Sequence, residues 1–63
     1  MRISLKAMRT DKKLTQKAVG EAVGVSKKTV GAWESGKTVP DANKIDALCK
    51  LFGCSYDDIR WKA

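Results

Sequence analysis

The chain has 63 residues, enough for one small domain that buries only about 60% of its unfolded surface. Its 43% hydrophobic and 32% charged residues are typical of a soluble globular domain and not of a disordered tail. Histidine is absent, so the commonest general base is missing, and two cysteines alone close neither a four-ligand zinc site nor a disulfide framework. We therefore expect one domain over residues 1–63, with no catalytic group, metal or cofactor.

The net charge of +6 is concentrated in the first part of the chain. Residues 1–11 carry +2, residues 12–37 carry +4, and residues 38–63 are neutral. A localised basic surface predicts a polyanionic partner, with nucleic acid ahead of a membrane, although a surface that serves only solubility is the alternative. No apolar run approaches the roughly 18 residues that span a membrane, and no signal-peptide core follows the N-terminus, so we expect a cytoplasmic protein.

Capping residues and helical periodicity predict the first two helices. Ser4 is a good N-cap for a helix that continues to about Lys12. Thr15 is the N-cap of a second helix over residues 16–23, whose apolar positions have helical spacing, and Gly24 ends it.

The remaining segments also read as helices. Ser26 begins a third helix over residues 27–35, and Asp41 begins a fourth that Gly53 ends. Ser55 and the aspartates after it resemble a capping box, which predicts a short fifth helix carrying Ile59. Because no alternating strand pattern competes, the predicted fold is all-α, a compact five-helix bundle.

The second and third predicted helices are joined by only three residues, 24–26. Two helices with so short a glycine-containing turn cross steeply, as in a helix-turn-helix. Their backbones come close at the crossing, where a small residue is needed, and Gly20 occupies that position. The exposed face of the third helix then carries Lys27, Lys28, Gly31 and Ala32, with Thr29 beside them.

Residues 16–35 resemble the helix-turn-helix signature of the phage Cro and repressor family and of the wider XRE-type regulators. The match rests on Gln16, Gly20, Gly24, Val25, Val30 and Trp33. The segment 33–37, WESGK, is similar to the family's usual end of the third helix, and residues 51–55 to its approach to the fifth. The resemblance covers essentially the whole chain and implies a lambda-repressor-like DNA-binding domain.

The resemblance also implies roles for individual residues. The third helix would enter the major groove of DNA, with base contacts from Lys27, Lys28, Thr29 and Ala32. Phosphate contacts would come from Gln16, Lys17, Ser26, Lys37 and Thr38. Arg9 and Glu34 stand where many family members carry a structural ion pair, and Lys13 where the family often has a left-handed glycine. Because lysine is a flexible point charge, base reading should be less strict and should rest more on phosphates and DNA shape.

Tight specific binding by one helix-turn-helix normally requires a two-fold dimer. In this family the dimer surface comes from the loop before the fourth helix and from the fifth helix. The corresponding residues of this chain are Val39, Tyr56, Arg60 and Trp61. Trp61 either contacts a second subunit or packs back on its own chain.

We therefore expect a sequence-specific DNA-binding transcriptional regulator, most simply a repressor that occupies an operator. Its partners would be double-stranded DNA and a second copy of the chain, with no membrane and no small-molecule ligand. The alternative is a protein-interaction module, such as an antitoxin or adaptor, that reuses the fold. An enzyme would need a catalytic group that we do not find in the sequence.

Overall fold

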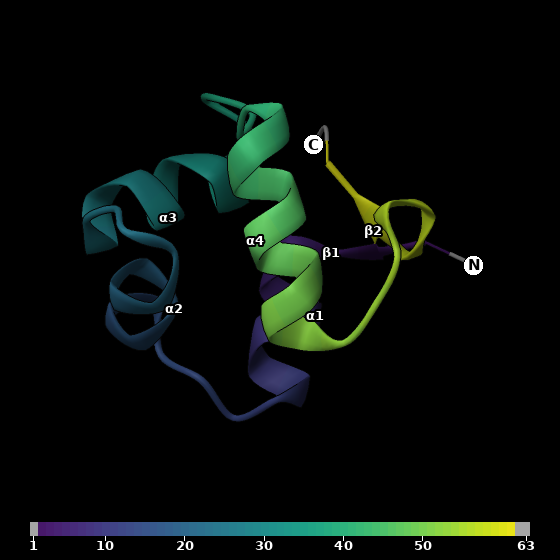
Figure 1. Cartoon of the computed structure of the whole chain (residues 1–63). Coiled ribbons are helices and arrows are strands. Elements are labelled where there is room, and N and C mark those ends of the chain that lie inside the picture. Colours follow the sequence, from purple (N-terminus) through teal and green to yellow (C-terminus); the bar gives the residue numbers. More distant parts are fainter. Residues whose placement is uncertain (1, 62–63) are drawn as a thin grey trace.

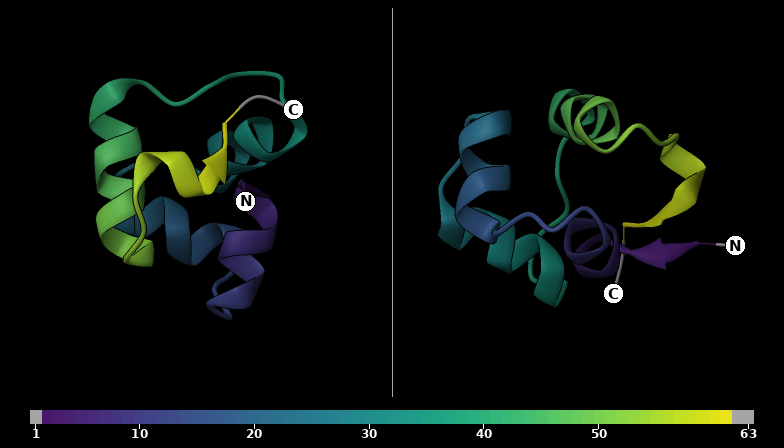
Figure 2. Two further views of the ribbon diagram at one scale, coloured as in Figure 1. Left: turned by 90° about the vertical axis from the view of Figure 1, so that its right-hand side faces the viewer. Right: turned by 90° about the horizontal axis from the view of Figure 1, so that it is seen from below.

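The computed structural model describes residues 2–61, which form four α-helices, one 3-10 turn and two short strands (Figure 1). The elements in chain order are β1 (Ile3–Ser4), α1 (Leu5–Asp11), α2 (Gln16–Val23), α3 (Lys27–Ser35), α4 (Ala42–Phe52), η1 (Tyr56–Asp58) and β2 (Ile59–Arg60). The right-hand view of Figure 2 shows α2 and α3 together on one side of the molecule and β1 and β2 on the opposite side. The helix-turn-helix therefore lies on the side of the molecule opposite to the two-stranded sheet.

Side-chain caps begin all four α-helices where the sequence predicts them. The capping pairs are Ser4 with the Ala7 N–H, Thr15 with Ala18, Ser26 with Thr29 and Asp41 with Lys44, at 2.9–3.2 Å. Each cap satisfies one of the backbone donors that a helix leaves free at its first turn. Lys13 has a φ of 58°, so the position that the family often gives to glycine is left-handed here and stores backbone strain.

The predicted fifth helix is wrong. Only the three-residue turn η1 forms, and the chain then extends into β2, which pairs in parallel with β1 so that Ile59 lies opposite Ile3. Extended backbone carries Ile59, with 1% of its surface exposed, into the core, and the Ile59 N–H donates to the Tyr56 carbonyl. The domain is thus mostly helical, with four α-helices instead of five and a small two-stranded sheet.

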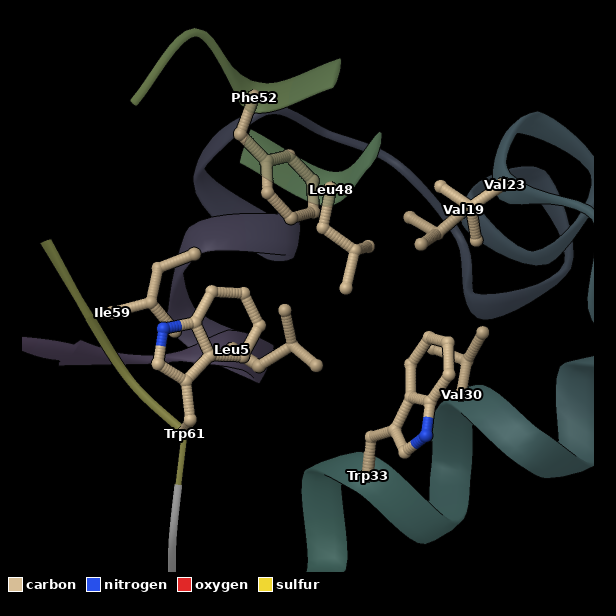
Figure 3. Close-up of a cluster of buried hydrophobic side chains, with 9 residues drawn as sticks. All are labelled: Leu5, Val19, Val23, Val30, Trp33, Leu48, Phe52, Ile59 and Trp61. Atoms are coloured by element: carbon tan, nitrogen blue, oxygen red, sulfur yellow. The ribbon is translucent and has the colours of Figure 1, made fainter. Parts of the chain in front are cut away.

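The core collects one or two side chains from each helix and from the C-terminal strand (Figure 3). Its members are Leu5, Val19, Val23, Val30, Trp33, Leu48, Phe52, Ile59 and Trp61. Trp61 folds back on its own chain, with 8% of its surface exposed and its Nε1–H donated to the Tyr56 carbonyl at 2.9 Å. Its ring also stacks on that of Tyr56, so the last described residue closes the core beside β2.

The crossing of α2 and α3 depends on Gly20. A Cβ atom at this position would lie 2.6 Å from the carbonyl oxygen of Val25, a backbone atom that cannot move away without shifting the turn. The Gly20 carbonyl accepts the N–H groups of Gly24 and Val25, each at 2.8 Å, and Gly24 adopts a left-handed φ of 82°. Residue 20 must therefore be glycine for α3 to pack this closely on α2.

The two helical glycines provide a matched test of this crossing. We expect Gly20→Ala to lower the free energy of unfolding by about 1–2 kcal/mol, because the new methyl group collides with backbone. Gly31→Ala should raise it by up to about 1 kcal/mol, since its Cβ meets only the Gln16 carboxamide at 3.7–3.8 Å and alanine favours helix. Thermal unfolding measures both, at about 4–8 °C per kcal/mol for a domain of this size. Equal effects of the two substitutions would contradict the close crossing.

The Asp58 carboxylate gives a test of the turn that replaces the fifth helix. It accepts the backbone N–H of Ser55 at 2.9 Å and the Ser55 hydroxyl at 3.2 Å, and these hydrogen bonds lower the pKa of Asp58 below its ordinary 3.8. Because the folded pKa is lowered, the stability it contributes is present above about pH 4 and is lost as the pH falls through the folded pKa.

We expect the Asp58 carboxyl resonance, followed by NMR, to titrate with a midpoint below 3.8. Ser55→Ala removes the hydroxyl donor but keeps the backbone donor, so the midpoint should rise only part of the way to the ordinary value. A wild-type midpoint at or above 3.8 would show that η1 is not held by this carboxylate.

Candidate nucleic-acid interface

The outward face of α3 is basic because its inward face is completely used by the core. Val30 is fully buried and Trp33 is 7% exposed, which turns Lys27 and Lys28 to solvent at the start of the helix. Neither lysine has an acidic neighbour in the first turn of α3. Positive charge at this end opposes the helix macrodipole and costs a few tenths of a kcal/mol in the free protein. Among the described residues, neither lysine forms an ion pair that would offset this cost.

A hollow of about 430 Å³ lies between the start of α2 and the outward face of α3. We call it the α2–α3 hollow; its lining residues are Gln16, Lys27, Lys28, Gly31, Ala32, Ser35 and Lys37. Three of the seven are lysines and none is acidic, so the hollow attracts anions. Its floor at Gly31 has no side chain, and the Gln16 carboxamide lies over that position.

Five of the nine residues predicted to contact DNA line this hollow, and each of the other four is next in the sequence to a lining residue. The five are Gln16, Lys27, Lys28, Ala32 and Lys37. Lys17 and Thr38 are exposed beside it. The hydroxyls of Ser26 and Thr29 lie 3.1 Å apart and are hydrogen-bonded to each other, so the polar group of Thr29 is already engaged at the start of α3.

Ser35 lines the hollow as well, although sequence reasoning did not assign it to the site. Ser35 is exposed at the end of α3, where its hydroxyl donates to the Ala32 carbonyl at 3.2 Å. It lies four residues after Gly31, and helical spacing of this kind was the available signal. Gly31, which the sequence places on the exposed face of the third helix, forms the floor on which the Gln16 side chain rests.

Behind the hollow, Arg9 and Glu34 form the ion pair that the family resemblance implies. Arg9 Nε is hydrogen-bonded to Glu34 Oε2, and its Nη1 donates to the Leu14 carbonyl at 2.8 Å. The two side chains are only 11% and 5% exposed. Glu34 Oε1 also accepts Gln16 Nε2–H at 2.9 Å, so the pair reaches the first residue of α2.

The four residues predicted for a dimer surface lie together on another part of the domain. They line a hollow of about 190 Å³ with Arg2: Val39, Tyr56, Arg60 and Trp61. Val39 and Tyr56 are 47% and 55% exposed, while Trp61 is buried behind Tyr56. The apolar surface open to a partner is therefore formed by Val39 and Tyr56.

A larger groove of about 470 Å³ lies between α4 and η1, and among its lining residues are Cys49 and Cys54. Burial raises the pKa of the Cys49 thiol, and the neighbouring Cys54 raises it further, so Cys49 is a thiol and a poor nucleophile at neutral pH. Within residues 2–61, no three His, Cys, Asp or Glu side chains are grouped to hold a metal ion. Over the same part of the chain, the helices are too short or too polar to cross a membrane.

Comparison with known proteins agrees with this geometry. Residues 5–59 match the helix-turn-helix family. The chain is 34% identical over 55 residues to the HTH-type transcriptional activator BcrR of Enterococcus faecalis, covering 87% of this chain but only 27% of BcrR. It is also 34% identical to the uncharacterized HTH-type transcriptional regulator YgzD of Bacillus subtilis, here over 97% of this chain and 92% of YgzD.

A solved structure extends the comparison to three dimensions. The crystal structure of the P22 c2 repressor protein in complex with a synthetic operator superimposes with a TM-score of 0.78 at 38% identity. The alignment covers 82% of this chain and 79% of that one, and the repressor belongs to Salmonella phage P22. The matched family, a relative of similar length and the shared fold all place the chain in one group. It belongs to the helix-turn-helix family of the Cro/repressor, or XRE, type.

Proposed function

We propose that the protein is a sequence-specific DNA-binding regulator of transcription that places the first half of α3 in the major groove. The observation that carries this proposal is the acid-free α2–α3 hollow, with its lysines turned outward at the start of α3. The similar P22 c2 repressor was solved in complex with a synthetic operator, which supports DNA as the partner. Against DNA, lysines that gain nothing in the free domain release counterions and contact base edges.

The contacts separate into two classes by their place around the hollow. Lys27 and Lys28 reach base edges, where lysine favours guanine O6 and N7, and Ala32 contacts a thymine methyl group one turn further on. Thr29 offers its methyl group and the hydrogen-bonding capacity that its hydroxyl keeps beside the hydrogen bond to Ser26. Phosphates are held at the two flanks: by Gln16, Lys17 and Ser26 on one side and by Lys37 and Thr38 on the other.

Two copies of the domain would bind the two halves of an operator. The exposed Val39 and Tyr56 supply the apolar part of the dimer surface and Arg60 its rim. Trp61 contributes indirectly, because its stacked ring and its hydrogen bond to the Tyr56 carbonyl hold Tyr56 in place. Occupation of a promoter by such a dimer gives repression in the cytoplasm with no enzymatic step.

Selection from a random duplex library at about 150 mM salt tests the function directly. We expect enrichment of an inverted repeat whose half-site centres lie about 10 base pairs apart, one helical turn. Binding that vanishes as salt rises, with no enriched sequence, would contradict specific recognition. Absence of binding even at low salt would overturn the proposal and favour a protein-interaction module.

Two lysine substitutions distinguish base contacts from phosphate contacts. Lys28→Ala should relax the preference at one operator position and cost about 1–3 kcal/mol against the preferred base. Lys37→Ala should weaken binding to all duplexes about equally and lower the slope of log K against log salt by about one. Fluorescence anisotropy with matched and single-mismatch duplexes measures both effects. If both variants weaken all duplexes uniformly, α3 does not read bases.

A further inference from the structure

Both carboxylate oxygens of Glu34, which lies behind the α2–α3 hollow, are hydrogen-bonded. Oε2 is hydrogen-bonded to Arg9 Nε, and Oε1 accepts from Arg9 Nη2 at 3.3 Å and from Gln16 Nε2 at 2.9 Å. Its side chain is 5% exposed, and the Arg9 guanidinium is itself anchored on the Leu14 carbonyl. A carboxylate held by a guanidinium fork in this way has little freedom, so it is a fixed point beneath the α2–α3 hollow.

The charge of Glu34 decides how the Gln16 carboxamide is turned. An ionised carboxylate only accepts hydrogen bonds, so the amide nitrogen of Gln16 must face it and the amide oxygen must face elsewhere. One amide proton is used by Glu34, and among the described residues the Gln16 side chain makes no second hydrogen bond. The amide rests over Gly31, 3.7–3.8 Å from where a Cβ atom would stand. One donor and one acceptor are therefore left at the wall of the hollow.

We propose that Glu34 is a positioning residue for DNA binding, which fixes the Gln16 carboxamide over Gly31 so that its free amide proton meets a DNA phosphate. The inference rests on the proposed function and extends it to a residue that touches no DNA. The open backbone N–H groups at the start of α2 add donors beside this proton, because the Thr15 cap uses only that of Ala18. Arg9 neutralises Glu34 from behind, so the carboxylate does not repel the phosphate.

A double-mutant cycle tests the coupling between the two residues. Gln16→Ala should weaken binding to the selected duplex roughly fivefold, the effect of one lost hydrogen bond. Glu34→Gln keeps the size of the side chain but presents an amide that can donate or accept, so it no longer orients Gln16. We expect it to weaken binding by a similar factor, and the double variant to bind no more weakly than Gln16→Ala alone.

Stability needs a matched control, because Glu34→Gln also weakens a buried ion pair. Ile59→Val removes a methylene group from the part of the core that β2 supplies, outside α2 and α3. All affinities are measured at a temperature where each variant is folded by circular dichroism. Ile59→Val should bind DNA as the wild type does. In the free protein, one Gln16 side-chain amide proton should resonate downfield of free glutamine, and Glu34→Gln should move it back.

The outcomes separate this inference from the function on which it rests. Additive losses in the double variant, or wild-type affinity for Glu34→Gln, would overturn the positioning role. Wild-type affinity for Gln16→Ala would overturn it as well, while the DNA-binding function would stand. If the unmodified protein binds no DNA, the proposed function itself fails, and the role of Glu34 in binding fails with it.

Discussion

The close crossing of α2 and α3 at Gly20 is the constraint on which the interface depends. Because the Val25 carbonyl occupies the space of a Cβ atom at residue 20, the turn packs directly on α2. That contact aims Val30 and Trp33 of α3 into the core, and the opposite face of α3 is consequently left to solvent. The lysines of this face and the hollow beside Gly31 are thus products of one backbone contact.

The charged residues of the interface fall into two groups: exposed lysines on its surface and a nearly buried ion pair behind them. The surface carries lysines without acidic partners in the hollow, which makes it attractive to polyanions. The ion pair is Arg9–Glu34, nearly buried and internally neutral, which joins α1 to the end of α3 and reaches Gln16 of α2. Three helices are therefore tied together directly beneath the surface that we assign to DNA. Because their relative positions are already fixed in the free protein, binding loses less conformational entropy.

Capping residues and helical spacing, which act over a few residues, predicted the four α-helices. The predicted fifth helix was wrong because of a contact between residues far apart in the sequence. Ser26 and Asp41 mark helix starts because a cap acts within three residues of itself. The predicted cap at Ser55 forms, because the Asp58 carboxylate accepts the Ser55 N–H. The helix does not continue beyond it, since Ile59 pairs with Ile3 near the other end of the chain. No pattern near Ile59 contains that information.

The same distinction applies to the candidate site. The lysines on the outward face of α3 follow from helical spacing and a short turn, so the sequence alone could place them together. The hydrogen bond between Gln16 and Glu34 joins residues 18 positions apart, and the one between Ser26 and Thr29 depends on rotamers. Neither could be deduced from spacing. The fold back of Trp61 likewise required knowing where β2 lies.

Amide NMR during titration with a mixed-sequence duplex at low salt tests most directly whether the face formed by α2 and α3 contacts DNA. Non-specific binding suffices, because it uses the same phosphate contacts. We predict that the largest shift changes fall on Lys17, Lys28, Gly31 and Lys37, while Ile45 and Cys49 in the groove between α4 and η1 stay unchanged. Changes centred on that groove, or on Val39 and Tyr56 alone, would contradict the account.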